Sequence, residues 1–368
     1  MMSQNVAERY LVSPFLVFFL VHGTQIGVGV LSFQRIANEI AGHDSWISVI
    51  IAGCVTSILL WMIYKILEKS KSADLIDVHK KCFGRWVGNL LSMVFFVYFL
   101  SLALIVLRFY IEIVQVWIFP EIGTWQLSLI MLILVYYAVT GGFRIVTELC
   151  FWGVVLPSLI FFPMLLFPLE FAHIQNLFPI FEHSIGDILR AAKEITISFT
   201  GFEALLIYFP FIKNQRESFR WAQFGVGFTT LLYLTIMLIS LTYFNERQLH
   251  YVIWPTLTLA KIPEIPFIER MEFIIISVYV LVIFPIICVL VWSVTRGIKR
   301  ITSIQQRKSL FFILILMLVG SIFLDARMKI EQVSRLLSNF AFYLLAAYIP
   351  FLYIYVSILK FFKKGRKV

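Results

Sequence analysis

The chain has 368 residues, of which 60% are hydrophobic and only 14% are charged, and its mean hydropathy is +0.90. These values exclude a soluble globular domain and predict an integral membrane protein. The net charge of +10 is explained by a cationic rim at the cytoplasmic ends of the spans, with lipid-specific recognition as the alternative, and requires no nucleic acid partner.

Apolar runs long enough to cross a hydrocarbon core of roughly 30 Å follow one another along the chain. We predict an all-α membrane protein with ten transmembrane helices, of which the first and sixth are broken. The spans are at residues 12–40, 46–67, 86–119, 124–141, 143–168, 186–212, 217–244, 268–295, 308–325 and 336–361.

The segment 171–184 is too polar to span a membrane and separates two five-helix repeats, at 1–168 and 186–361. Together the repeats form one membrane domain, followed by a basic cytoplasmic tail at 362–368. The loop at 245–267 is long, and we expect it to have helical hairpin character. Lys and Arg are concentrated in alternate loops, so the sequence predicts that both termini are cytoplasmic; the last outer loop, with Arg327, Lys329 and Arg335, fits this pattern least well.

Two features argue against an enzyme. Hydrophilic stretches reach only roughly twenty residues, too few for an independent catalytic domain. The cysteines are widely spaced and form no C-x-x-C pair, so we expect no disulfide, no metal site and no cofactor; they are Cys54, Cys82, Cys150 and Cys288.

Glycine and polar residues interrupt the first predicted span. The candidate binding residues there are Gly23, Thr24, Gln25, Gly27, Val28, Gly29 and Val30. If the helix unwinds at 27–29 and resumes at about Val30, the amides of residues 28–30 are free at a helix N-terminus and form an anion site. The alternative is that Gly27 and Gly29 only permit close helix packing. The adjacent His22 is either a structural residue or a proton carrier.

A matching interruption lies in the sixth predicted span. Its candidate residues are Phe199, Thr200, Gly201, Phe202 and Glu203. Carbonyl groups before this break would receive an ammonium group, so the two breaks together would bind both ends of a zwitterion such as an amino acid.

Three ionisable residues at membrane depth are functional candidates, because charge is costly there. Glu203 is a proton carrier, an ammonium partner or a structural anchor. Arg108 and Glu112 are four residues apart, on one helix face, and we expect an internal ion pair that fixes helix register or couples transport.

Four sequence segments carry a resemblance to known proteins. They are residues 27–31 (GVGVL), 198–203 (SFTGFE), 254–256 (WPT) and 267–270 (FIER). With these segments and broken helices 1 and 6, the chain resembles the amino acid–polyamine–organocation transporter superfamily, whose fold is a 5+5 inverted repeat. Within it, the chain is similar to the B subunit of spore nutrient-germinant receptors, the endospore germination permease family.

The resemblance implies a protein of the spore inner membrane that senses a small nutrient and works with an A-type membrane subunit and a C-type lipoprotein. Its ligand, which we expect to be an amino acid, would lie at 23–29 and 200–203. An alternative function is a proton- or sodium-coupled amino acid transporter, and a third is a subunit of an ion-release channel.

Overall fold

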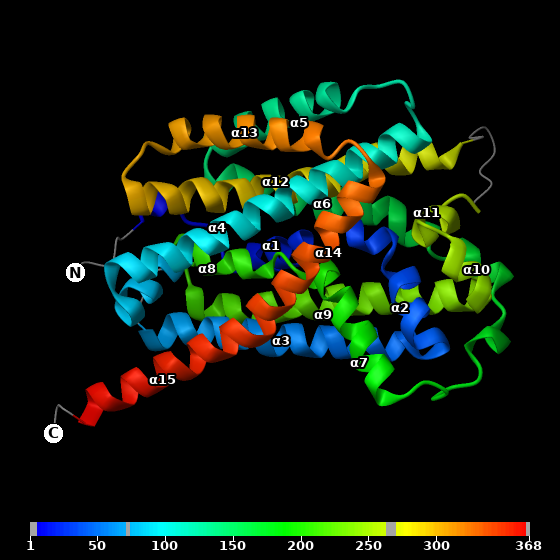
Figure 1. Ribbon diagram of the computed structural model, residues 1–368, viewed down its shortest axis with the longest axis horizontal. Helices are drawn as coiled ribbons and strands as arrows, with labels where there is room; N and C mark the ends of the chain where they lie inside the picture. Colours follow the sequence, from blue (N-terminus) through cyan, green and yellow to red (C-terminus); the bar gives the residue numbers. More distant parts are fainter. Residues whose placement is uncertain (1–5, 71–73, 263–269, 366–368) are drawn as a thin grey trace.

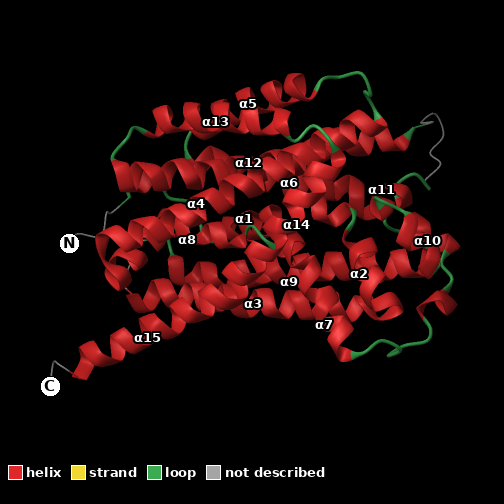
Figure 2. Cartoon of the chain, viewed as in Figure 1, coloured by secondary structure: helices red, strands yellow, loops and turns green. Residues whose placement is uncertain are grey.

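The computed structural model describes residues 6–70, 74–262 and 270–365, and within these residues the chain is helical apart from turns, loops and one isolated β-bridge between Val12 and Ile212 (Figure 2). The α-helices of the described residues are α1 (Leu16–Gln25), α2 (Phe33–Ala41), α3 (Ser45–Ser70), α4 (Leu75–Trp117), α5 (Thr124–Thr140), α6 (Phe143–Met164), α7 (Ile185–Glu194), α8 (Leu205–Tyr208), α9 (Gln215–Tyr243), α10 (Glu246–Tyr251), α11 (Pro255–Leu259), α12 (Met271–Thr302), α13 (Gln306–Phe323), α14 (Arg327–Tyr343) and α15 (Ile349–Gly365).

The apolar helices confirm the predicted all-helical class. Within the described chain, seven helical segments are long and apolar enough to cross a membrane, and the bent pair Ile185–Phe199 with Phe202–Phe211 would make an eighth. The shorter apolar helices α1 and α5 occupy the first and fourth predicted spans. The count of ten spans stays a prediction, and residues 268 and 269, which open the predicted eighth span, lie outside the described residues.

Both ends of the described chain lie at one end of the bundle, and α10 and α11 lie near the opposite end (Figure 1). The C-terminal part of α12, which is rich in Lys and Arg, lies at the same end of the bundle as the chain termini. The loop predicted at 245–267 contains two short helices, α10 and α11, in its described part.

Polar caps explain where several helices begin. The side chain of Ser184 accepts a hydrogen bond from the Asp187 amide at the start of α7, and Asn245 does the same for Gln248 at the start of α10. Asp74 and Asn214 cap α4 and α9 in the same way. Each cap satisfies an amide that the first helical turn leaves without a partner.

Packing places the broken helices inside the bundle. Helix α1 packs against α6, α9 and α12, and α12 packs along α4 and α6. Every described residue from Leu20 to Gln25 is buried. In a bilayer, irregular backbone is tolerated only where protein or a cavity surrounds it, which is the position that this packing gives the first break.

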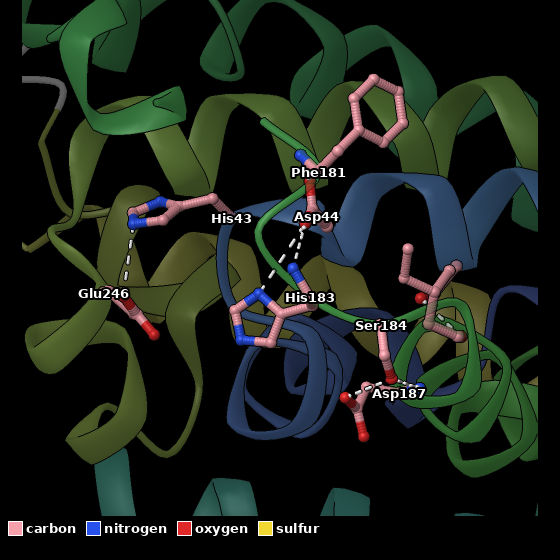
Figure 3. A network of polar contacts seen from close by, with 9 residues as sticks. His43, Asp44, Phe181, His183, Ser184, Asp187 and Glu246 are labelled. Atoms are coloured by element: carbon pink, nitrogen blue, oxygen red, sulfur yellow. Dashed lines mark hydrogen bonds and ion pairs between the residues drawn. The ribbon is translucent and has the colours of Figure 1, made fainter. Parts of the chain in front are cut away.

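The segment between the two predicted repeats is fixed to the end of the bundle far from the termini. Asp44, whose side chain is fully buried, accepts hydrogen bonds from the amides of Phe181 (2.7 Å) and His183 (3.0 Å), as Figure 3 shows. In the same network His43 Nε2 lies 3.2 Å from a carboxylate oxygen of Glu246 at the start of α10. These contacts hold the entrance to α7, and hence the second break, in place.

Replacing Asp44 by alanine should lower the stability of the detergent-solubilised protein by about 1–3 kcal/mol, because two partly buried amides lose their acceptor. The apparent midpoint of thermal unfolding measures this loss. Glu246→Ala is the matched control in the same network: its carboxylate is half exposed (49%), so its removal should cost less than about 1 kcal/mol. An equal fall in both variants would contradict the assigned role of Asp44.

Candidate functional site

The first break lies where the glycine and polar residues predicted it. Helix α1 ends at Gln25, a 3₁₀ turn covers Val28–Leu31, and α2 begins at Phe33. The Val30 amide donates to the Gly27 carbonyl (3.2 Å), so the prediction of three free amides is wrong for Val30, because the tight turn uses it. Among the described residues, none accepts a hydrogen bond from the amide of Val28 or Gly29.

The second break separates a 3₁₀ segment at Ile195–Phe199 from another at Phe202–Ala204, and the chain bends by 53° there. Gly201 has φ = +109°, and a Cβ built on it would lie 2.5 Å from the Thr24 carbonyl oxygen. Both the left-handed backbone and the close approach to the first break therefore require glycine at this position.

Hydrogen bonds join the two breaks directly. The Gln25 side-chain amide donates to the Phe199 carbonyl (2.9 Å), and the Tyr233 hydroxyl lies 3.1 Å from the Gln25 carbonyl oxygen and 3.0 Å from that of Ser198. A Cβ on Gly29 would lie 2.5 Å from Ser198 Oγ. The alternative that a glycine permits close packing therefore applies to Gly29, because a side chain at this position would keep the two breaks apart.

His22 belongs to the same buried network. Its Nδ1 lies 2.9 Å from the Thr229 hydroxyl, which also lies 3.0 Å from Gln25 Oε1. The histidine thereby supports the side chain that bridges the breaks, which favours its structural interpretation.

A cavity of about 110 Å³ lies between the breaks. Its lining comes from both breaks, from one face of α4, from single residues of α2, α12 and α14, and from the tryptophan that precedes α11; the residues are Thr24, Gln25, Gly27, Val28, Gly29, Ser32, Ile36, Leu102, Ile105, Val106, Phe109, Ile113, Ile197, Ser198, Thr200, Trp254, Ile286 and Ser334. Within the described residues no charged side chain is part of this lining. Pockets for drug-sized ligands reach roughly 300–1,000 Å³, so this one suits only a small molecule.

Half of the sequence-predicted binding residues line this cavity, namely Thr24, Gln25, Gly27, Val28, Gly29 and Thr200. The others lie beside it and do not line it: Gly23, Val30, Phe199, Gly201, Phe202 and Glu203. Sequence reasoning missed the apolar wall of α4, although its spacing (102, 105, 106, 109, 113) is that of one helix face. Because residues 90–107 of α4 are almost all apolar, this face does not differ in hydropathy from the other faces of the helix.

The carboxylate of Glu203 holds the second break. One of its oxygens accepts from the Tyr98 hydroxyl (2.6 Å) and the other from the Gly201 amide (2.8 Å), and the residue is fully buried. An unwound amide at this depth must find an acceptor inside the protein. The geometry therefore favours the anchor interpretation of Glu203.

The prediction that Arg108 and Glu112 form an ion pair is wrong, because within the described residues each of them contacts another partner. Glu112 pairs with Arg327 (3.2 Å), and Arg108 Nε donates to the Leu324 carbonyl (2.7 Å). The C-terminal carbonyls of α13 have no helical partner and attract the guanidinium, which the spacing along α4 could not reveal.

Arg327 connects this charge cluster to the cavity. Its guanidinium carbon lies 5.0 Å from the centre of the Trp254 ring, which is part of the cavity lining. Beside it, a hydrogen bond from Lys329 (2.7 Å) lowers the pKa of the exposed Asp325 carboxyl. The cluster therefore covers the cavity at the end of the bundle away from the termini.

The fold matches that of a solved transport protein. The chain superimposes with a TM-score of 0.62 on the structure titled "Substrate-bound outward-open state of a Na+-coupled sialic acid symporter reveals a novel Na+-site", with 12% sequence identity over 97% of this chain and 79% of that one. The fold and the paired breaks thus define an integral membrane protein with a transporter-like fold.

Sequence comparisons then assign the family. Residues 11–330 match the family model described as "Spore germination protein". The chain is 40% identical to spore germination protein GerQB of Bacillus cereus over 351 residues, covering 95% of this chain and 97% of that protein. It is 24% identical to spore germination protein A2 of Bacillus subtilis (strain 168), covering 93% and 94% of the two chains. The chain belongs to this family of spore germination proteins.

Proposed function

We propose that this protein is the B-type membrane subunit of a nutrient-germinant receptor and that it binds a small nutrient, an amino acid, in the cavity between the two breaks. The observation that carries the proposal is the cavity itself, which has irregular backbone at one side and uncharged apolar walls at the other. The amides of Val28 and Gly29 would bind the carboxylate, since no described residue accepts from them.

The cationic end of the ligand would lie at the second break. The carbonyls of Ser198 and Phe199 already accept hydrogen bonds from Tyr233 and Gln25, whereas no described residue donates to the Thr200 carbonyl. An ammonium group there would supply the missing donor, and the ligand's side chain would contact the aliphatic face of α4. Leu102, Ile105 and Val106 lie on that face.

The topology completes the proposal. We place ten spans in two inverted five-helix repeats, 1–168 and 186–361, in the spore inner membrane. Both termini and the tail 362–368 then lie on the cytoplasmic side. The cavity then faces outward beneath Trp254. The partners in this proposal are an A-type membrane subunit and a C-type lipoprotein.

Signalling requires that the ligand bind two conformations with different affinity. A ligand in the cavity would contact both breaks, and the Tyr233 hydroxyl connects both breaks to α9. A conformation with a different spacing between the breaks would therefore bind the ligand with a different affinity. The alternative function is a proton- or sodium-coupled amino acid transporter, which the symporter-like fold supports. Concentrative uptake of labelled amino acid by vesicles that contain this chain alone would overturn the receptor proposal.

The uncharged lining predicts ligand selectivity. Purified protein in detergent should be stabilised against heat by L-alanine, L-valine or L-leucine and not by L-lysine or L-glutamate, whose charged side chains would be buried without a partner. At 100 times the dissociation constant, binding adds about 2.7 kcal/mol to stability. Stabilisation by the charged amino acids alone would contradict the assigned cavity.

A further inference from the structure

A second and larger cavity opens between α3, α7 and α14, on the other side of the second break. Its volume is about 480 Å³, against about 110 Å³ for the central cavity. The lining residues are Ile51, Ala52, Val55, Thr56, Leu59, Leu189, Arg190, Ala192, Lys193, Thr196, Phe199, Phe202, Phe342 and Leu345. We name it the lateral groove.

The interior of the lateral groove is apolar. Its two threonines do not make it polar, because the Thr56 hydroxyl donates to the Ala52 carbonyl (2.7 Å) and the Thr196 hydroxyl to the Ala192 carbonyl (3.1 Å) within their own helical segments. Val55 and Leu189 are 44% and 52% exposed. The groove therefore opens sideways, toward the surrounding lipid in the proposed membrane orientation.

Two cations stand at one end of the groove. Arg190 and Lys193 are three residues apart on α7 and so share a face. Their closest acids are Asp187, 4.0 Å from Arg190, and Glu194, 3.9 Å from Lys193, and neither acid lines the groove. Ion pairs this long, at partly exposed positions, contribute little free energy, so both cations can bind another anion.

The length of the groove along the α7 segment is comparable to the thickness of one leaflet. Phe199 is nine positions beyond Arg190, and with a rise of about 1.5 Å per residue in α7 and about 2 Å in the 3₁₀ segment Ile195–Phe199 the two residues are about 15 Å apart along the segment. Half of a hydrocarbon core is roughly 15 Å. A phosphate beside the two cations would therefore let an acyl chain extend along the apolar interior as far as the middle of the membrane.

We propose that the lateral groove binds one anionic phospholipid, with its phosphate against Arg190 and Lys193 and an acyl chain between α3, α7 and α14. An apolar helix of a partner protein would also bury the walls, but it would leave the two cations with only their long contacts to Asp187 and Glu194. The phosphate of a lipid would pair with the two cations, and its acyl chain would cover the apolar walls.

The lipid would contact the back of the second break. Phe199 and Phe202 flank Thr200 and Gly201, and the Phe199 ring stacks on Tyr233 with their centres 4.9 Å apart. Tyr233 is the residue whose hydroxyl contacts both breaks. Lipid occupancy thus stabilises one arrangement of the second break.

The test uses the full-length protein, purified in detergent, and measures retained lipid by native mass spectrometry during titration with phosphatidylglycerol or phosphatidylcholine. We expect one phosphatidylglycerol per protein, bound in preference to phosphatidylcholine. The double variant Arg190→Gln, Lys193→Gln should weaken phosphatidylglycerol binding at least about tenfold. Arg247→Gln with Lys329→Gln, cations outside the groove, is the charge-matched control and should retain binding.

A second variant tests the acyl-chain site separately. Val55→Trp fills the groove from an exposed position and keeps both cations, so it should also lose the bound lipid while the unfolding midpoint stays unchanged. Retention of lipid by Val55→Trp would show adsorption of the headgroup alone and overturn the proposal. Equal retention of both lipids, or a partner protein occupying the groove instead, would overturn it as well.

Discussion

Spores that carry Gly27→Leu should lose the response to their nutrient, with a rise in the half-maximal concentration of at least about 100-fold, or about 2.8 kcal/mol. Gly27 lines the cavity at φ = −97°, a backbone conformation open to any residue, and the nearest atom to a Cβ there is Ile286 Cδ1 at 3.6 Å. Leucine therefore fits the backbone without strain and fills the space of the ligand. Measurement of spore germination against nutrient concentration checks this result.

The matched control is Gly227→Leu. No atom lies within 4 Å of a Cβ at Gly227, which is an exposed residue of α9, so this variant should respond as the wild type does. Immunoblots of spore membranes establish that both variants accumulate. A normal response from an accumulated Gly27→Leu protein would place the nutrient elsewhere.

Replacing Glu203 should separate hydrogen bonding from charge. Glu203→Ala leaves the Gly201 amide and the Tyr98 hydroxyl buried without their partner, and we expect a loss of about 2–4 kcal/mol of stability together with the response. Glu203→Gln can keep both contacts: its carbonyl oxygen accepts from Gly201, and its amide donates to the tyrosine oxygen, because a hydroxyl group also accepts.

Glu203→Gln should therefore respond within about threefold of the wild type. Thermal unfolding of the purified variants and germination of the corresponding spores measure the two effects. If Glu203→Gln accumulates normally and is silent, the carboxylate acts through its proton or its charge, and the transporter alternative gains support.

Local signals were enough to locate the breaks. Gly27, Gly29 and Gly201 interrupt apolar runs. At membrane depth a helix loses its backbone hydrogen bonds only where the chain is buried in protein or lines a cavity. The same signals could not tell which glycine faces open space. Both Gly27 and Gly29 line the cavity, but a Cβ on Gly29 would collide with Ser198 whereas one on Gly27 would meet no atom closer than 3.6 Å, and only the packing of segments about 170 residues apart separates these roles.

The partners of the charged residues were equally hidden. The spacing of Arg108 and Glu112 placed them on one helix face, yet Glu112 pairs with Arg327 and Arg108 with carbonyls at the end of α13. More than two hundred residues lie between these partners in the chain, and periodicity reports only on neighbours within one helix.

The sequence by itself determined the membrane class, the helical content, the two breaks and the family, because hydropathy, glycine placement and motif order are local properties of the chain. Tertiary structure alone decided which face of α4 becomes a cavity wall, that Tyr233 contacts both breaks, and that Glu203 anchors the second break instead of lining the cavity. The physical reason is that in an almost uniformly apolar chain, the difference between a lipid-facing and a cavity-facing residue is set by the helices around it.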